Sequence, residues 1–169
     1  EVRDLPTTSG FRSPSDAPVA DVDEPFVARI RESGAIFIGK TNTPEFGLGS
    51  HTYNAIGPTT GNVVDSALSA GGSSGGAAVA VASGMVPVAD GSDFMGSLRN
   101  PPGWNGVLGL RPSPGVVLGA GENPASPGLG VEGPIARSVD DLSALLATMA
   151  EPGRFATPAP PSVTWPPRV

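Results

Sequence analysis

The chain has 169 residues, enough for the core of one ordinary domain, and a formal net charge of −6. Its ten basic residues are scattered, which disfavours nucleic-acid binding, because that function needs clustered lysine and arginine. The absence of cysteine and the single histidine, His51, exclude disulfides, thiolate metal sites and multi-histidine metal sites. No apolar run approaches membrane-spanning length, so we expect a cytoplasmic protein with no membrane partner and no bound metal.

The first half of the sequence predicts a helix followed by a strand. Residues 24–33 have apolar positions at helical spacing, and Gly34 ends this helix. The apolar run from Ala35 to Ile38 is typical of a buried strand. Thr43, followed by a proline and a glutamate, indicates the start of another helix. A helix joined to a strand in this way is typical of an α/β protein.

The second half predicts a small-residue helix, a second buried strand and a terminal helix. Residues 74–83 form the small-residue helix, residues 86–89 form the strand, and residues 90–99 turn into a further element. Ser138 opens the last helix as its N-cap. The core stripe of that helix comprises Leu142, Leu145, Leu146 and Met149. Residues 151–169 are rich in proline, and we expect this tail to be irregular.

The stretch from Gly34 to Thr41 matches the phosphate-binding pattern G-x-x-x-x-G-K-[ST] at every fixed position. A phosphate-binding loop is a nest of backbone N–H groups placed after a strand and before a helix. Here the variable positions are the apolar residues of the expected strand itself, and Pro44 interrupts any helix that would follow. A nucleotide-binding module is therefore the weaker alternative. We expect Lys40 instead to hold loops by hydrogen bonds at the end of the strand.

Glycine and serine are concentrated in two motifs on either side of the small-residue helix. The first is the Gly-Gly-Ser-Ser-Gly-Gly run at 71–76, and the second, at 90–99, contains Ser97. Such residues also form flexible linkers, but a linker would not run directly into an apolar helix and strand. A hydroxyl nucleophile needs backbone N–H groups that converge on the carbonyl oxygen it attacks, and glycine permits that approach. Because His51 is the only histidine, a serine hydrolase built here would need a lysine or an unusual relay.

These residues resemble the amidase signature family. The resemblance fades in the tail, and the matching segments are Val2-Arg3-Asp4-Leu5, Gly39 to Phe46, the glycine–serine run, Gly109 to Ser113 and Glu132 to Arg137. It implies an α/β fold with a mixed central β-sheet flanked by helices, of which residues 1–150 would be an incomplete portion. It also implies hydrolysis of small-molecule carboxylic amides, at C–N bonds other than peptide bonds, without a cofactor. The resemblance is also compatible with a homo-oligomer.

The same resemblance implies roles for individual residues. Ser97 would be the nucleophile, Ser73 the serine that relays its proton, and Ser74 a supporting hydroxyl. In the family the relay serine is held by a cis peptide bond. The oxyanion hole would be formed by the backbone N–H groups of Phe94, Met95, Gly96 and Ser97. Asp93 and Arg99 are expected to hold the loop as structural charges.

Two departures from the family pattern concern catalysis. The family's catalytic lysine falls on Arg3, whose guanidinium can donate a hydrogen bond to Ser73 but cannot accept its proton. Met95 stands where the family usually has a glycine. A methionine there would strain the turn or block the site if that backbone needed a positive φ. The alternative to an active amidase is therefore a catalytically impaired amidase-like protein.

Overall fold

The computed structural model describes residues 1–119 and 128–155, and it confirms the α/β class. The helices are α1 (Pro25–Glu32), α2 (Gly75–Ala82), α3 (Asn100–Trp104) and α4 (Val139–Met149), with one 3-10 turn, η1 (Glu45–Gly47). The strands are β1 (Val88–Asp93), β2 (Leu108–Gly109) and β3 (Val131–Ala136).

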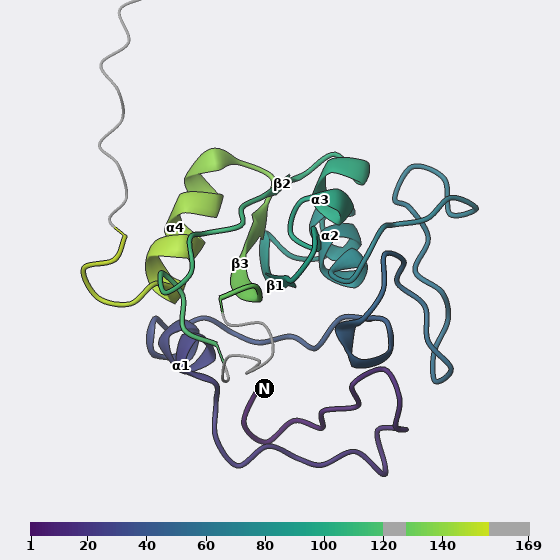
Figure 1. Ribbon diagram of the computed structural model, residues 1–169, viewed down its shortest axis with the longest axis horizontal. Coiled ribbons are helices and arrows are strands. Elements are labelled where there is room, and N and C mark those ends of the chain that lie inside the picture. The colour runs from purple at the N-terminus through teal and green to yellow at the C-terminus, as the bar shows by residue number, and fades with distance from the viewer. Residues whose placement is uncertain (120–127, 156–169) are drawn as a thin grey trace, which may run out of the picture.

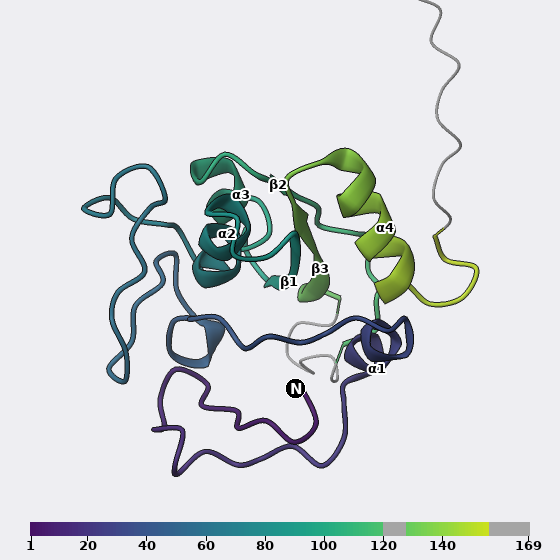
Figure 2. The same cartoon turned by 180° about the vertical axis from the view of Figure 1, so that it is seen from behind.

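The strands form a sheet in the order β1-β3-β2, in which both pairings are antiparallel. Strand β1 pairs with β3 from Val88 opposite Ala136 to Asp93 opposite Val131. Helices α2 and α3 lie on one side of the sheet and α4 on the other, with α1 below α4 (Figure 1), as the view from behind also shows (Figure 2). The described strands are thus antiparallel. The mixed sheet implied by the resemblance would need a parallel partner for one of them.

Two apolar clusters hold these layers together. The cluster between α1 and α4 comprises Phe26, Val27, Ile30, Val117, Leu145, Leu146 and Met149. The cluster under α2 comprises Ala77, Val81, Leu98 and Ile135. Three of the four residues in the predicted stripe of α4 are therefore in the core, and Leu142 is only half-buried. The small side chains of α2 let this helix pack closely against the sheet.

Three of the four predicted helices are confirmed, and their ends agree with the expected ones to about one residue. The N-cap of α4 is also confirmed, because the Ser138 hydroxyl accepts a hydrogen bond from the backbone N–H of Asp141 at 3.1 Å. Capping residues and apolar spacing are local signals, which explains why they were sufficient here.

The prediction of a buried strand from Ala35 to Ile38 is wrong. This run has no regular secondary structure, and Ile36 and Ile38 are 89% and 72% exposed. A buried strand needs a hydrogen-bonded neighbour, and the structure places none of its described strands beside this run. Only Phe37 turns inward, where the Arg31 guanidinium lies 4.7 Å from the centre of its ring.

Two smaller expectations also changed. The strand predicted at residues 86–89 begins at Val88 and continues to Asp93, because its pairing with β3 extends through the expected turn. The helix expected at Thr43 is only the single turn η1, because Phe46 adopts a positive, non-helical φ of 53°.

The beginning of the proline-rich tail packs onto the domain. Glu151 forms an ion pair with Arg29 of α1 and donates its backbone N–H to the Val116 carbonyl at 2.8 Å. Phe155 lies against the cluster between α1 and α4. The rest of the predicted irregular tail, residues 156–169, lies outside the described residues, and the boundary at residue 150 stays a prediction.

Candidate active site

The two glycine–serine motifs converge on strand β1. Ser73 lies in the loop before α2, and Ser97 lies in the turn after β1. A Cβ atom at Gly91 of β1 would lie 2.8 Å from Ser74 Oγ and 3.0 Å from Leu98 Cδ2. Ser74 and Leu98, which follow the two candidate catalytic serines, therefore both pack against Gly91, and a side chain at this position would collide with them.

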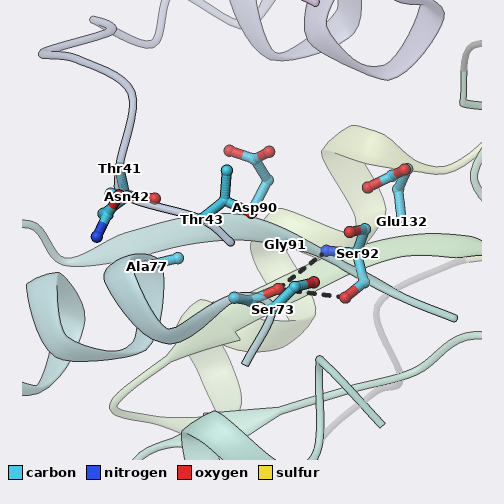
Figure 3. A pocket seen from close by; sticks show the side chains of 10 residues that line it. Thr41, Asn42, Thr43, Ser73, Ala77, Asp90, Gly91, Ser92 and Glu132 are labelled. Carbon is cyan, nitrogen blue, oxygen red and sulfur yellow. Dashed lines mark hydrogen bonds between the residues drawn. The ribbon is translucent and has the colours of Figure 1, made fainter. Parts of the chain in front are cut away.

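The serine hydroxyls differ in their hydrogen bonds. Ser74 Oγ donates to the Ser92 carbonyl and accepts from the Ser92 N–H, both at 3.2 Å (Figure 3). Ser73 and Ser97 are 6% and 9% exposed, and neither hydroxyl is hydrogen-bonded to another residue within 1–119 or 128–155. Ser74 thus ties its loop to β1, whereas the other two hydroxyls are available for chemistry.

Thr52 fixes the loop that carries Ser73. The fully buried Thr52 hydroxyl donates to the Gly71 carbonyl at 2.8 Å and accepts from the Gly75 N–H at 3.1 Å. The peptide bond between Gly72 and Ser73, inside this clamp, is cis. Sequence reasoning missed Thr52, because an isolated threonine in a long polar connection carries no signal of its own.

Asp93 holds the turn that carries Ser97. Its buried carboxylate accepts hydrogen bonds from the backbone N–H groups of Gly96 (2.7 Å) and Leu98 (3.0 Å). It also pairs with Arg99 at 3.0 Å and with Arg111 at 3.1 Å. Burial raises the pKa of Asp93, but the hydrogen bonds from Arg99 and the two backbone groups outweigh it and hold this pKa below its ordinary value. The structural role predicted for Asp93 and Arg99 is confirmed.

The predicted oxyanion hole needs one correction. The Gly96 N–H donates to Asp93, so this group is already occupied. The N–H groups of Phe94, Met95 and Ser97 have no hydrogen-bond partner in the described part of the chain and could donate to a ligand. The expected strain at Met95 is absent, because the positive φ in this turn, 127°, falls on Gly96.

The polar contacts that the structure gives Arg3 are with two acidic residues, Asp4 and Asp23. The Arg3 side chain is 51% exposed, with its Nε 3.7 Å from an Asp4 carboxylate oxygen. Its backbone N–H donates to Asp23 at 2.7 Å. No hydrogen bond joins Arg3 to Ser73 among the residues described, so a catalytic role for Arg3 stays a prediction.

A polar pocket of about 160 Å³ lies beside Ser73. The carboxylates of Asp90 and Glu132 extend into it from β1 and β3 (Figure 3). Burial raises the pKa of Glu132 to about 8, and the negative charges of Glu24 and Asp90 add to this effect. Sequence reasoning gave neither pocket acid a role, because Asp90, at the start of the second serine motif, and Glu132, on β3, come together only in the fold.

The stretch from Gly34 to Thr41 lacks the context of a phosphate-binding loop. It follows helix α1 and precedes extended chain, whereas that loop connects a strand to a helix. Lys40 Nζ donates to the Pro6 carbonyl at 3.2 Å and to Thr7 Oγ1 at 3.0 Å. The loop-holding role of Lys40 is confirmed, and the geometry argues against nucleotide binding.

Solved structures of amide-cleaving enzymes share this fold. A bacterial aryl acylamidase of the amidase signature family matches with a TM-score of 0.79 and 36% identity, over 88% of this chain and 31% of its own. A 6-aminohexanoate cyclic dimer hydrolase matches with a TM-score of 0.82 and 36% identity, over 96% of this chain and 35% of its own.

In the residues described here, no helix has the length and apolar character required to cross a membrane.

Sequence comparison gives the same result. A putative amidase, AmiB2, from Mycobacterium bovis is 45% identical over 85% of this chain. A glutamyl-tRNA(Gln) amidotransferase subunit from Picosynechococcus sp. is 46% identical over 72% of it. The chain spans 31% and 25% of the lengths of these two relatives, respectively. The sequence profile of the amidase family matches residues 1–167. The chain belongs to the amidase family.

Proposed function

We propose that this chain supplies the nucleophile and the proton-relay serine of a site that hydrolyses small carboxylic amides. The observation that carries the proposal is the pair of nearly buried hydroxyls, Ser73 and Ser97, which have no hydrogen-bond partner in the described residues. They come from two motifs that meet at Gly91. Family membership and the amide-cleaving relatives support this choice of chemistry.

In the proposed reaction, Ser97 Oγ attacks the carbonyl carbon of the amide. Its proton passes to Ser73, and the proton of Ser73 passes to a base. The base returns a proton through Ser73 to the nitrogen as the C–N bond breaks, which releases the amine and leaves an acyl group on Ser97. Water then hydrolyses this ester and regenerates the serine. The backbone N–H groups of Phe94 and Met95, with that of Ser97, support the oxyanion.

The second candidate function is an amidase-like protein with impaired turnover, and Arg3 favours it. The family lysine falls on this position, and a guanidinium does not give up its proton at neutral pH, so it cannot serve as the base. A nucleophile without a proton acceptor would react with an activated electrophile but would turn over amides slowly.

A fluorophosphonate tests the nucleophile without requiring turnover. We expect the folded chain to gain one phosphonyl group, seen in the intact mass, and Ser97→Ala to abolish this gain. Ser66→Ala is the matched control, because Ser66 is exposed and its hydroxyl lies outside both motifs. Equal labelling of the Ser97→Ala variant, or no labelling of the folded chain, would overturn the assignment.

Hydrolysis of a simple anilide tests the base. We expect Arg3→Lys to raise the rate above that of the unchanged chain while leaving fluorophosphonate labelling in place. If the unchanged chain already hydrolyses anilides as fast as the variant does, impairment at position 3 is refuted. A cytoplasmic location and a homo-oligomer stay predictions.

A further inference from the structure

The polar pocket contacts only one of the two candidate catalytic serines. Ser73 forms part of its wall, whereas Ser97 does not. Phe94 and Met95, whose N–H groups support the proposed oxyanion, are also outside its wall. A group that receives the relayed proton must contact the relay serine, whereas a subsite for the substrate must also reach the nucleophile. The pocket therefore has the position expected for the base.

The pairing of the strands places two carboxyl groups in this pocket. Glu132 of β3 lies directly opposite Ser92 of β1. Side chains alternate along a strand, so Asp90 and Ser92 project from one face of β1, and Glu132 projects from the same face of the sheet. All three side chains line the pocket (Figure 3). The acids are thus held by the sheet on the side of the pocket formed by β1 and β3.

The loop that carries Ser73 is fixed against the same strand. The hydroxyl of the next residue, Ser74, is hydrogen-bonded to both backbone groups of Ser92 at 3.2 Å. Ser73 itself is 6% exposed, and its hydroxyl has no hydrogen-bond partner among the residues described. The pocket of about 160 Å³ has room for water, since one molecule occupies roughly 30 Å³ in the liquid. A single water molecule is enough to carry a proton between a hydroxyl and a base.

We propose that the carboxylate of Glu132 is the base that receives the proton of Ser73, through water in the polar pocket. The inference rests on the proposed function, because it names the base of that reaction. It also supplies the proton acceptor that the guanidinium at position 3 cannot provide.

The proton moves in both directions during each half of the reaction. As Ser97 Oγ bonds to the carbonyl carbon, its proton passes to Ser73, and the proton of Ser73 passes through water to Glu132, which becomes a neutral carboxylic acid. When the C–N bond breaks, a proton returns from Glu132 through Ser73 to the nitrogen, and the carboxylate is restored. In the second half, the attacking water gives its proton to Glu132 by the same route, and this proton returns to Ser97 Oγ as the ester bond breaks.

The charges around Glu132 suit it to this exchange. Burial and the negative charges of Glu24 and Asp90 raise its pKa to about 8, against the opposing charge of the Glu1 amino group. The positive charge of Lys40 acts on Asp90. A base whose pKa lies near the working pH both accepts and returns a proton readily, whereas an ordinary glutamate would be too weak a base.

Anilide hydrolysis by the folded chain tests this base, and fluorophosphonate labelling reports separately on the nucleophile. We expect Glu132→Gln to lower kcat about 100-fold while KM and the extent of Ser97 labelling stay within about twofold. Glu132→Asp keeps a carboxyl group and should retain part of the rate. Glu45→Gln removes the same charge from an exposed position and should not change the rate.

The pH profile distinguishes a base from a residue that only supports the fold. In the unchanged chain, kcat/KM should rise with pH and reach half of its maximum near pH 8, because only the ionised form of Glu132 accepts a proton. Asp90→Asn removes a neighbouring negative charge, which lowers the pKa of Glu132 and should move this rise to lower pH. Glu132→Gln should remove the rise.

Three results with a labelled Ser97 would overturn the inference and leave the proposed nucleophile intact. The first is an unchanged kcat in Glu132→Gln. The second is a higher KM for amides of cationic amines at an unchanged kcat, which would assign the pocket to the substrate. The third is the absence of anilide hydrolysis by the unchanged chain at every pH. If Ser97 is not labelled in the folded chain, the proposed function itself fails, and this inference fails with it.

Discussion

Neutralising Glu132 should stabilise the protein at alkaline pH. Burial and the nearby carboxylates of Glu24 and Asp90 raise the pKa of Glu132 from 4.5 to about 8, against the opposing charge of the Glu1 amino group. In the unfolded chain this carboxyl returns to its ordinary pKa. The folded state therefore binds the proton more tightly, and stability is lost as the pH rises from about 4.5 to about 8.

The pKa difference limits the size of the effect. One pKa unit corresponds to about 1.4 kcal/mol. The ionisation of Glu132 can therefore lower the free energy of unfolding by at most about 5 kcal/mol. Water reaches the carboxyl group through the pocket, so we expect Glu132→Gln to gain about 2 kcal/mol at pH 8.5. In a chain of this size, that gain raises the unfolding midpoint by about 4–8 °C.

Thermal unfolding at pH 5 and pH 8.5 measures this difference. The variant should exceed the unchanged chain clearly at pH 8.5 and much less at pH 5, where the folded protein holds Glu132 protonated. Glu45→Gln removes the same charge at an exposed position and serves as the matched control. If Glu132→Gln and the unchanged chain lose stability in parallel between these pH values, Glu132 is not held in its neutral form and the reasoning is refuted.

Three further substitutions test the packing of the site, each by urea unfolding. Leu98→Ala removes a fully buried side chain and should cost about 3 kcal/mol, so a loss below about 1 kcal/mol would show that the surrounding structure collapses into the space. Asp93→Asn breaks a buried charge network and should cost about 3 kcal/mol; a neutral result would contradict its role. Thr52→Val keeps the shape but leaves the Gly75 N–H without its acceptor, with an expected loss of about 1–3 kcal/mol. Thr52→Ser should retain most of that stability, and equal losses in the two Thr52 variants would implicate packing instead.

The helices could be predicted from the sequence because their signals are local. Ser138 caps α4 through a residue three positions away, and the apolar spacing of α1 lies within a single helix. The run from Ala35 to Ile38 shows the limit of such signals. Its composition indicates a strand, but a strand exists only with a neighbour, and its own sequence does not reveal whether one is present.

The candidate active site, like the fold, could be predicted from the sequence only where its signals are local. Its two serine motifs could be found, because glycine and serine at short spacing carry a chemical meaning by themselves. Thr52 and Glu132 could not, because each acts across a long sequence separation: Thr52 on Gly75, and Glu132 beside Asp90. The occupation of the Gly96 N–H by Asp93 also required three-dimensional geometry, since a neighbouring acid can equally point away from the turn.

The turn that carries Ser97 is held by groups that do not include position 3. Asp93 binds Gly96, Leu98, Arg99 and Arg111, all of which follow it in the chain. On the assignment of the base to position 3 that the family pattern implies, a change at Arg3 alters the proton acceptor without removing any hydrogen bond that shapes the turn of Ser97. Labelling of Ser97 and turnover of an amide consequently report on different parts of the molecule. Strong labelling with slow turnover would be the signature of an intact nucleophile whose base is missing.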